Sequence, residues 1–200
     1  MSMKHAIVSL MAALWLAPAS AYADTPDDIV FDVYRNGTPF GEHVVRFREL
    51  GDGELEVDVD VRLRAGLGPI TLFRYSHDSR EIWRDGELVS LIAETFNDGE
   101  ETGVTLSGGD LPVLPLSSHW RGYDPQLDRV FNTETGEPMD VEIEDFGIET
   151  LQTPNGAVQA RRIRITGTLT ADLWYDETGR WVGCAFQARG QDIRYVLRND

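Results

Sequence analysis

The sequence predicts an all-β protein, an antiparallel meander of about ten strands closed or curled into a barrel or half-barrel. No window of helical length carries apolar residues at i, i+3, i+4 and i+7, whereas alternating apolar and polar residues are common. Asx-Gly and Thr-Gly pairs, which favour tight hairpins, recur along the chain. Because successive hairpins would each have one apolar face to bury, we expect closure or curling rather than a Greek-key sandwich.

The first 23 residues have the pattern of a secretory signal peptide. Lys4 and His5 precede an apolar run at 6–17, and small residues follow. This run of 12 residues is shorter than the roughly 20 needed to span a bilayer. Small residues permit cleavage after Ala21 or after Ala23, and we favour the second.

Residues 24–200 are then expected to form a single exported β-barrel-like domain. No cysteine stands directly after either cleavage point, so lipid anchoring is not expected, and no later stretch is apolar enough to span a membrane. The sequence therefore predicts a periplasmic or secreted protein without stable membrane insertion.

Composition limits the partners and the covalent chemistry. The chain has 34 acidic and 18 basic residues, a formal net charge of −16, which disfavours nucleic acids and anionic membrane surfaces. Cys184 is the only cysteine, so no intramolecular disulfide can form. Its setting in "RWVGCAF" indicates a small buried apolar side chain rather than a nucleophile.

The clearest strand is "ELEVDVDVRLRAGL" (54–67), in which apolar residues alternate with acidic residues and arginines. That alternation is typical of an antiparallel strand with one face in water. Applying the same criteria along the chain gives these strands, with ends uncertain by two to four residues: about 28–36, 38–50, 54–67, 70–84, 87–97, 100–107, 128–133, 137–152, 157–176 and 180–198, with a break near Gly190.

One long Pro- and Gly-rich segment (107–128) departs from this pattern. Three prolines rule out a regular ladder, and we expect a crossing loop with one helical turn near 117–121. Such a loop is either a functional lid or a passive connection across the end of a barrel.

The segment "YSHDSREIWRDGELVSLIAETF" (75–96) reads as a hairpin around Asp85-Gly86. A two-residue turn there pairs Trp83 with Leu88 and, continued without interruption, His77 with Glu94. The face that these pairs share would carry Tyr75, His77, Ser79, Glu81, Trp83, Ser90, Glu94 and Phe96. If the aromatic residues mark the interior, a polar patch lies inside; a single β-bulge would instead turn it to solvent.

A buried carboxylate beside a histidine can hold a metal, orient a base or bind a polar ligand. The spacing of His43, His77 and His119 matches no metal motif, and no nucleophile elbow is present. We therefore assign no catalytic residue, metal ligand or cofactor. His119 and its neighbour Trp120 either cover a binding mouth or anchor the loop. The candidate ligand-binding residues are His77, Glu94, Glu81, Tyr75, Trp83, His119 and Trp120.

The segments "FDVYRNGTPFGEHVVRF", "YSHDSREIWRDGELVSL", "PLSSHW" and "LWYDETGRWVGCAF" resemble a family of exported (periplasmic) bacterial proteins of unknown function. The resemblance spans roughly Ile29 to Leu197. The closing "Tyr-Asp-x-x-Gly-Arg" hairpin is similar to one in a broader group of exported β-proteins with curved sheets, similar to lipoprotein-carrier-like folds. The resemblance implies a β-barrel or half-barrel handling a lipid-like or envelope-derived ligand, and implies no activity.

Three functions follow as hypotheses. The first is a non-enzymatic protein that binds an amphipathic or envelope-derived ligand in its barrel. The second is an envelope interaction or structural module without a small ligand, with an envelope protein as partner. The third is an envelope hydrolase or metal-dependent enzyme that uses His77 and Glu94. We rank them in this order, because no catalytic motif supports the third.

Overall fold

The computed structural model describes residues 25–67, 70–154, 156–168 and 170–198. They form twelve antiparallel strands and one short 3-10 helix, η1. The predicted signal peptide and its cleavage point lie outside these residues. In the described part of the chain, no helix has both the length and the apolar character needed to cross a membrane. The elements are β1 (Ile29–Arg35), β2 (Thr38–Gly51), β3 (Glu54–Leu67), β4 (Ile70–Arg84), β5 (Glu87–Asn97), β6 (Glu100–Ser107), η1 (Gly108–Asp110), β7 (Arg129–Phe131), β8 (Pro138–Thr153), β9 (Gly156–Gly167), β10 (Ala171–Asp176), β11 (Trp181–Ala188) and β12 (Gln191–Leu197).

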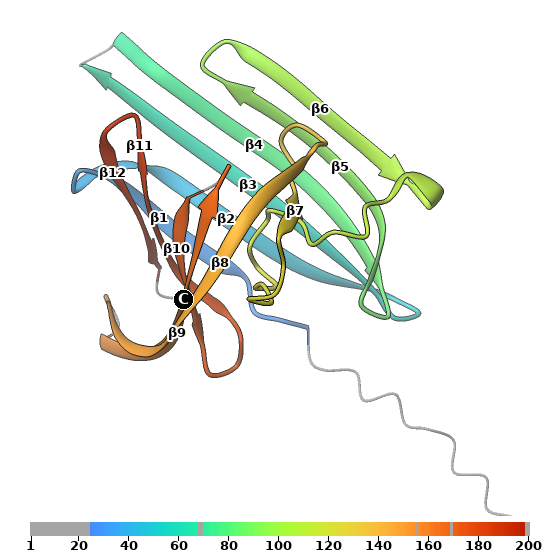
Figure 1. The fold of residues 1–200 in the computed structure, drawn as a ribbon. Coiled ribbons are helices and arrows are strands. Elements are labelled where there is room, and N and C mark those ends of the chain that lie inside the picture. Colours follow the sequence, from blue (N-terminus) through green and yellow to red (C-terminus); the bar gives the residue numbers. More distant parts are fainter. Residues whose placement is uncertain (1–24, 68–69, 155, 169, 199–200) are drawn as a thin grey trace, which may run out of the picture.

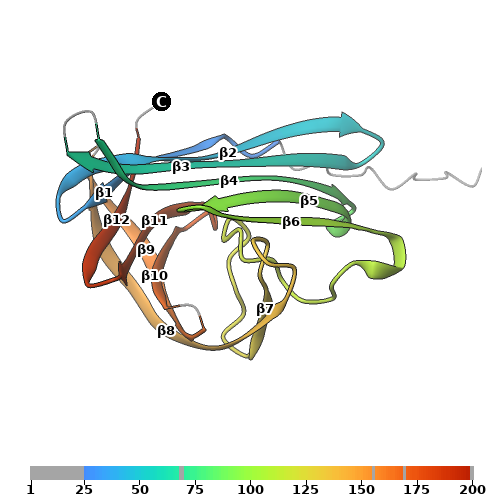
Figure 2. The same cartoon turned by 90° about the horizontal axis from the view of Figure 1, so that it is seen from above.

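All twelve strands lie in a single sheet with the order β6-β5-β4-β3-β2-β1-β12-β11-β10-β9-β8-β7. Strands β2 to β6 form a long layer, and β12 to β8 curl away beneath it, so the sheet is curled and its edges β6 and β7 do not pair (Figure 1). Seen from above, the segment between β6 and β7 lies on the concave side of the curl (Figure 2). The predicted all-β meander in a half-barrel is confirmed.

The structure has twelve strands because two of the predicted strands are each divided. Residues 157–176 form β9 and β10, and residues 180–198 form β11 and β12. Gly167 ends β9 with a φ of 112°, and a Cβ there would lie 2.6 Å from the Asp140 carbonyl oxygen. Arg189 and Gly190 both have positive φ, which gives β11 and β12 a tight hairpin turn. Arginine is not a turn signal, so the sequence indicated only the break.

The alternation of residues in β3 produces the expected division between core and surface. Val57, Val59, Val61 and Leu63 are buried, while Glu54 and the charged residues between the valines lie on the outer face. Many of these charged groups form cross-strand pairs, such as Arg80 with Asp58 and Arg84 with Glu54. The apolar face of the sheet therefore lies on the inside of the curl.

A bulge in β2 brings an additional aromatic side chain into this interior. Val33 pairs with Gly41 and Tyr34 with Pro39, so Phe40 is the extra residue and its side chain is buried. A Cβ on Gly41 would lie only 1.9 Å from the Arg62 carbonyl oxygen. The bulge therefore requires glycine at this position.

The segment 108–128 covers the free edge of β7. The amide of Ser117 donates to the Phe131 carbonyl, and the Phe131 amide donates to the Pro115 carbonyl. The predicted helical turn at 117–121 is wrong. His119 has a φ of 66°, which a right-handed turn cannot contain, and the one helical turn of the segment is η1.

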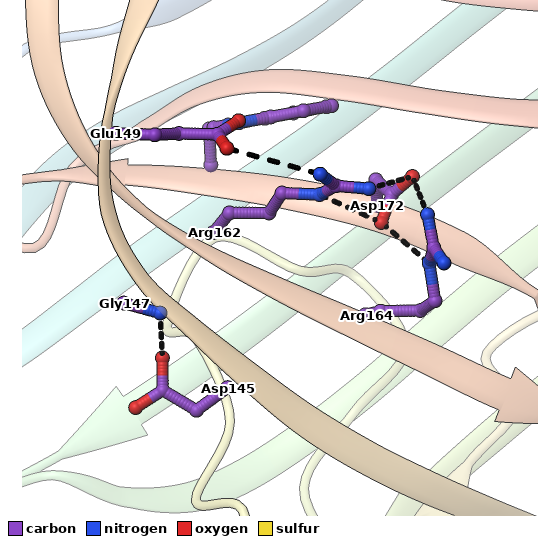
Figure 3. Close-up of polar contacts among 7 residues, drawn as sticks. Asp145, Gly147, Glu149, Arg162, Arg164 and Asp172 are labelled. Carbon is purple, nitrogen blue, oxygen red and sulfur yellow. Dashed lines mark hydrogen bonds and ion pairs between the residues drawn. The ribbon is translucent and has the colours of Figure 1, made fainter.

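The outer face of β9 and β10 is held by a carboxylate between two guanidinium groups. Asp172 accepts hydrogen bonds from Nε of both Arg162 and Arg164, at 3.1 and 2.8 Å, and a further nitrogen of each arginine lies within 3.1 Å of its second oxygen (Figure 3). Burial alone would raise the pKa of Asp172, but these hydrogen bonds and charges outweigh it, and the pKa lies below its ordinary value.

Asp172→Asn should destabilise the protein by about 1–2 kcal/mol, because charge-assisted hydrogen bonds contribute more than neutral ones and this pair is partly exposed. The lowered pKa means that the stabilisation is complete above the unfolded-state pKa of about 3.9 and is lost as pH falls through the folded-state pKa. Urea unfolding at several pH values measures both effects. Asp140→Asn removes the same charge from a carboxylate whose side chain is 90% exposed. This variant should lower the free energy of unfolding by at most a few tenths of a kcal/mol. Equal losses in the two variants would contradict the prediction.

Candidate functional site

The hairpin of β4 and β5 turns at Asp85-Gly86 as predicted, but its register changes after two pairs. Trp83 pairs with Leu88, whereas Ile82 pairs with Ser90, so Val89 is an extra residue. Both turn residues have positive φ, as a type I′ turn requires. The bulge reverses the parity of β5 beyond it.

This bulge makes the predicted pairing of His77 with Glu94 wrong. His77 pairs with Thr95, and Glu94 pairs with Asp78 on the outer face, where its side chain is exposed. The extra residue belongs to β5 and does not change the direction of side chains on β4. The predicted site residues of β4 therefore point inward: Tyr75, His77, Glu81 and Trp83. A His77–Glu94 catalytic or metal pair is therefore not formed.

His77 belongs to a cross-strand row that runs over five strands of the concave face. Phe31 pairs with His43, His43 with Val61, Val61 with His77, and His77 with Thr95. All five side chains are buried. The row thus places two histidines on the concave face with one valine between them.

A cavity of about 480 Å³ lies over this row, within the size range of small-molecule sites. Strands from both arms of the curl supply its walls, and the covering segment 108–128 supplies the rest. Its lining residues are Arg35, Phe40, His43, Val59, Val61, Leu63, Phe73, Tyr75, His77, Asn97, Ser117, Ser118, His119, Glu134, Ala171, Cys184, Phe186, Ala188, Arg189, Gln191, Ile193 and Tyr195.

One end of the cavity lies at the ends of the strands and is framed by aromatic rings and arginines. The rings of Phe40 and Phe73 stack with their centroids 5.8 Å apart. The guanidinium of Arg35 lies 5.4 Å from the Phe40 centroid, and that of Arg189 lies 5.6 Å from the Phe73 centroid. The two arginines of the lining therefore lie at this end, which we call the rim.

Polar groups from three segments meet at the other end, which we call the floor. His77 Nδ1 shares a 2.8 Å hydrogen bond with the Thr95 hydroxyl, and its Nε2 lies 3.5 Å from the Thr133 hydroxyl. Ser117 Oγ accepts a hydrogen bond from the Thr133 amide. Burial lowers the pKa of His77, against the opposing charges of Glu134 and Asp78. Both nitrogens of His77 thus have partners within the protein.

His119, on the covering segment, has a hydrogen-bond partner within the described residues for only one of its two ring nitrogens. Its Nδ1 lies 2.6 Å from the Tyr123 hydroxyl, which donates to the Leu116 carbonyl at 3.0 Å. Because that hydroxyl has a single proton, Nδ1 must be the donor to it, and Nε2 carries a lone pair. Burial lowers the pKa of His119 to about 4, so its imidazole is neutral at pH 7.

His43 is buried and lines the cavity, and neither ring nitrogen has a hydrogen-bond partner among the described residues. Its ring makes edge contacts with Trp181, Tyr195 and Phe31, with centroids 5.1, 5.5 and 6.3 Å away. Burial lowers the pKa of His43 to about 3, with smaller effects from His119 and His77. A neutral imidazole with an unused donor and an unused acceptor therefore lies at the floor.

Glu81 lies outside the cavity and anchors the covering segment. Its side chain is 0% exposed, and its Oε2 accepts hydrogen bonds from the indoles of Trp83 and Trp120, at 2.8 and 3.0 Å. The two indole rings meet edge to face, with centroids 5.8 Å apart. Oε1 lacks a partner of good geometry, although the Ser118 hydroxyl is near enough to stabilise the charged form.

Burial raises the pKa of Glu81, and this effect outweighs the hydrogen bonds from Trp120, Ser118 and Trp83 and the charge of Arg121. The Arg121 guanidinium lies 4.3 Å from the Trp83 centroid and completes the anchor. We call Glu81, Trp83, Trp120 and Arg121 the Glu81 anchor.

The seven predicted site residues therefore have three different locations. Tyr75, His77 and His119 line the cavity, where Tyr75 donates a 2.5 Å hydrogen bond to Glu134. Glu81, Trp83 and Trp120 form the anchor, and Glu94 is on the outer face. The sequence analysis missed several lining residues from other strands: Arg35, Phe40, His43, Phe73, Glu134, Arg189 and Tyr195. Only His43 left a usable signal, since it shares its strand face with Val45 and Phe47.

Within the described residues, no group of three or more His, Cys, Asp or Glu side chains is arranged to hold a metal ion. Cys184 lines the cavity wall, and burial raises the pKa of its thiol well above the ordinary value. It is therefore a buried, protonated side chain, as its apolar neighbours in the sequence indicated.

Glu81→Ala should destabilise the protein by about 3 kcal/mol, because it leaves two indole donors without an acceptor and opens a cavity. Hydrogen exchange should show faster exchange in the segment 111–127 than elsewhere.

Glu81→Gln keeps an acceptor for both indoles. Because the folded-state pKa of Glu81 is raised, ionisation destabilises the wild type as pH rises through that pKa, and Gln removes this penalty. Unfolding measured over a series of pH values upward from the unfolded-state pKa of about 4.3 should thus favour Gln increasingly. An equal loss of stability in Glu81→Ala and Glu81→Gln would contradict the anchor.

His43→Phe should flatten the acid side of the pH–stability profile. The lowered pKa of His43 makes its contribution complete above the unfolded-state pKa of about 6.5 and lost as pH falls toward 3. At pH 5 the wild-type penalty from this residue is about 2 kcal/mol. Urea unfolding at pH 7.5 and 5 should show that penalty removed, with stability at pH 7.5 unchanged or higher, because no hydrogen bond is lost.

His77→Phe is the matched control for this experiment. It removes the hydrogen bond with Thr95 and should cost about 1 kcal/mol at pH 7.5. An equal loss of stability in His43→Phe and His77→Phe at pH 7.5 would contradict the prediction. It would mean that His43 has a hydrogen-bond partner in the folded protein.

Comparison with known proteins agrees with this architecture. Residues 31–198 match the family model described as "Domain of unknown function (DUF6134)". No curated protein matches the chain. A crystal structure of a beta-barrel-like protein of the domain of unknown function DUF1849, from Brucella abortus, superposes with a TM-score of 0.55 at 8% identity, covering 86% of this chain and 95% of that one. At that identity the likeness concerns the fold alone. The curled twelve-stranded chain belongs to the DUF6134 family of unknown function.

Proposed function

We propose that this protein binds an amphipathic, envelope-derived small molecule in the cavity and catalyses no reaction on it. The observation that carries the proposal is the cavity itself, which is lined mainly by aliphatic and aromatic side chains with a few polar groups at its ends. Concave, mostly apolar sites with few polar groups are typical of small-molecule binding.

The distribution of polar groups supports an amphipathic ligand rather than a purely apolar one. Between rim and floor, the walls carry Val61, Leu63, Ile193 and Phe186. Such walls favour an apolar chain or ring through the hydrophobic effect. Guanidinium groups at the rim and imidazoles at the floor offer hydrogen bonds to polar atoms at either end of the molecule.

The chemistry of the site gives little support to catalysis. Glu94 is on the outer face, and the three histidines are neutral groups whose pKa values burial holds low. A general base works best when its pKa is near the operating pH. A binding function also suits the proposed periplasmic location, which rests on the signal-peptide pattern of residues 1–23.

Ala188→Trp tests whether ligands enter the cavity. Ala188 is exposed and lines the rim, so a tryptophan should obstruct the cavity without disturbing the core. Mature protein purified from the periplasm is titrated with N-phenyl-1-naphthylamine, a neutral amphipathic fluorophore. We expect binding to the wild type and roughly tenfold weaker binding to the variant, a loss of about 1.4 kcal/mol.

Ala157→Trp is the matched control, because Ala157 is exposed on β9 and does not line the cavity. It should bind the fluorophore like the wild type. Absence of binding to the wild type, together with no molecule retained in native mass spectrometry, would favour an interaction module without a small ligand. Equal binding to all three proteins would place the binding outside the cavity.

A further inference from the structure

The floor of the cavity contains buried hydrogen-bonding groups that the protein itself does not use. His43 has two ring nitrogens without a partner among the described residues, in a side chain that is 6% exposed. A buried polar group without a partner costs stability, and in native proteins such a group calls for a bound molecule or a functional role. His77, on the same row and also lining the cavity, has partners for both nitrogens.

His119 supplies a complementary group next to the same aromatic ring. The rings of His43 and His119 both make edge contacts with Trp181, with centroids 5.1 and 5.5 Å away. The Nε2 atom of His119 is an acceptor because its Nδ1 donates to Tyr123. His43, as a neutral imidazole, has one N–H donor. The floor therefore offers a donor from His43 and an acceptor from His119.

A hydroxyl group uses both of these, because it accepts one hydrogen bond and donates another. A carboxylate could use only the donor. It would lie near the Glu134 carboxylate and away from the lining arginines, Arg35 and Arg189, which are at the rim. Burying an anion without a charged partner is strongly unfavourable. An ammonium group would find only the acceptor of the two histidines, and the Glu134 carboxylate already accepts a hydrogen bond from Tyr75.

Building on the proposed binding function, we propose that the ligand enters with an uncharged hydroxyl group leading, and that this hydroxyl bridges His43 and His119 at the floor. The ligand class is an alcohol amphiphile, with an apolar body against Val61, Leu63 and Ile193. Its opposite end reaches the Phe40–Phe73 pair at the rim.

Competition against N-phenyl-1-naphthylamine tests this with three ligands of equal chain length. They are 1-decanol, decyl methyl ether, which accepts but cannot donate, and decanoate at pH 8. Wild-type protein should bind decanol about fivefold to tenfold more tightly than the ether, the worth of one hydrogen bond, and more tightly than decanoate. His43→Phe should lose this preference, because it removes the donor while keeping an aromatic ring of similar size.

Two further variants separate the loss of a hydrogen bond from a damaged fold. His43→Gln retains a donor and should recover part of the preference. Ser79→Ala, which changes a buried side chain that does not line the cavity, should keep it. Equal affinity for decanol and the ether, tighter binding of decanoate, or a preference that survives His43→Phe would each overturn the inference while leaving the cavity a binding site. Failure of all three ligands and of the fluorophore to bind the wild type would overturn both the inference and the proposed function.

Discussion

The cavity exists because a buried carboxyl group holds a loop against the concave face of the sheet. A curled sheet with unpaired edges leaves part of its apolar face uncovered, and the segment between β6 and β7 covers it. Glu81 attaches that segment by accepting the indole protons of Trp83 from the sheet and Trp120 from the loop. One residue before Trp120, His119 reaches the floor. The position of the loop histidine therefore depends on an interaction between two tryptophans and one acid.

Burial strengthens the hydrogen bonds of the Glu81 anchor, and it also keeps the histidines at the floor uncharged. Burial disfavours the charged form of every group, so it raises the pKa of Glu81 and lowers those of His43 and His119. Three histidines around one cavity would repel each other if protonated, and neutrality avoids this at pH 7. A chain with a net charge of −16 thus keeps the three histidines that line its cavity uncharged at pH 7. The Glu134 carboxylate, which accepts a hydrogen bond from Tyr75, lines the same cavity.

The sequence predicted the sheet well because alternation and Asx-Gly turns are local signals. The strands at 54–67, 70–84, 87–97 and 100–107 have the predicted bounds. The site was harder to predict, because it depends on bulges. Only Gly41 marks the bulge at Phe40, and no turn or glycine signal marks the one at Val89. Val89 shifts β5 by one residue and moves Glu94 outward, and Phe40 is moved inward by the same kind of irregularity. Residues 75–83 of β4 pair with β3 without interruption, and their side chains alternate as the sequence indicated. His43 and His119 are far apart in the sequence, and only the folded chain places both beside Trp181.

Glu134 both links the two edges of the curled sheet and lines the cavity. The edges β6 and β7 form no ladder with each other, and the turn after β7 connects them through side chains instead. Thr102 on β6 donates to the Glu134 carbonyl at 2.6 Å, while the Glu134 carboxylate accepts from Tyr75 on β4. Glu134 and Tyr75 also line the cavity. Because a few side-chain hydrogen bonds replace a continuous backbone ladder there, this wall has fewer constraints than the others. The cavity is consequently enclosed by rigid strand pairing on most sides and by adjustable side-chain contacts on one.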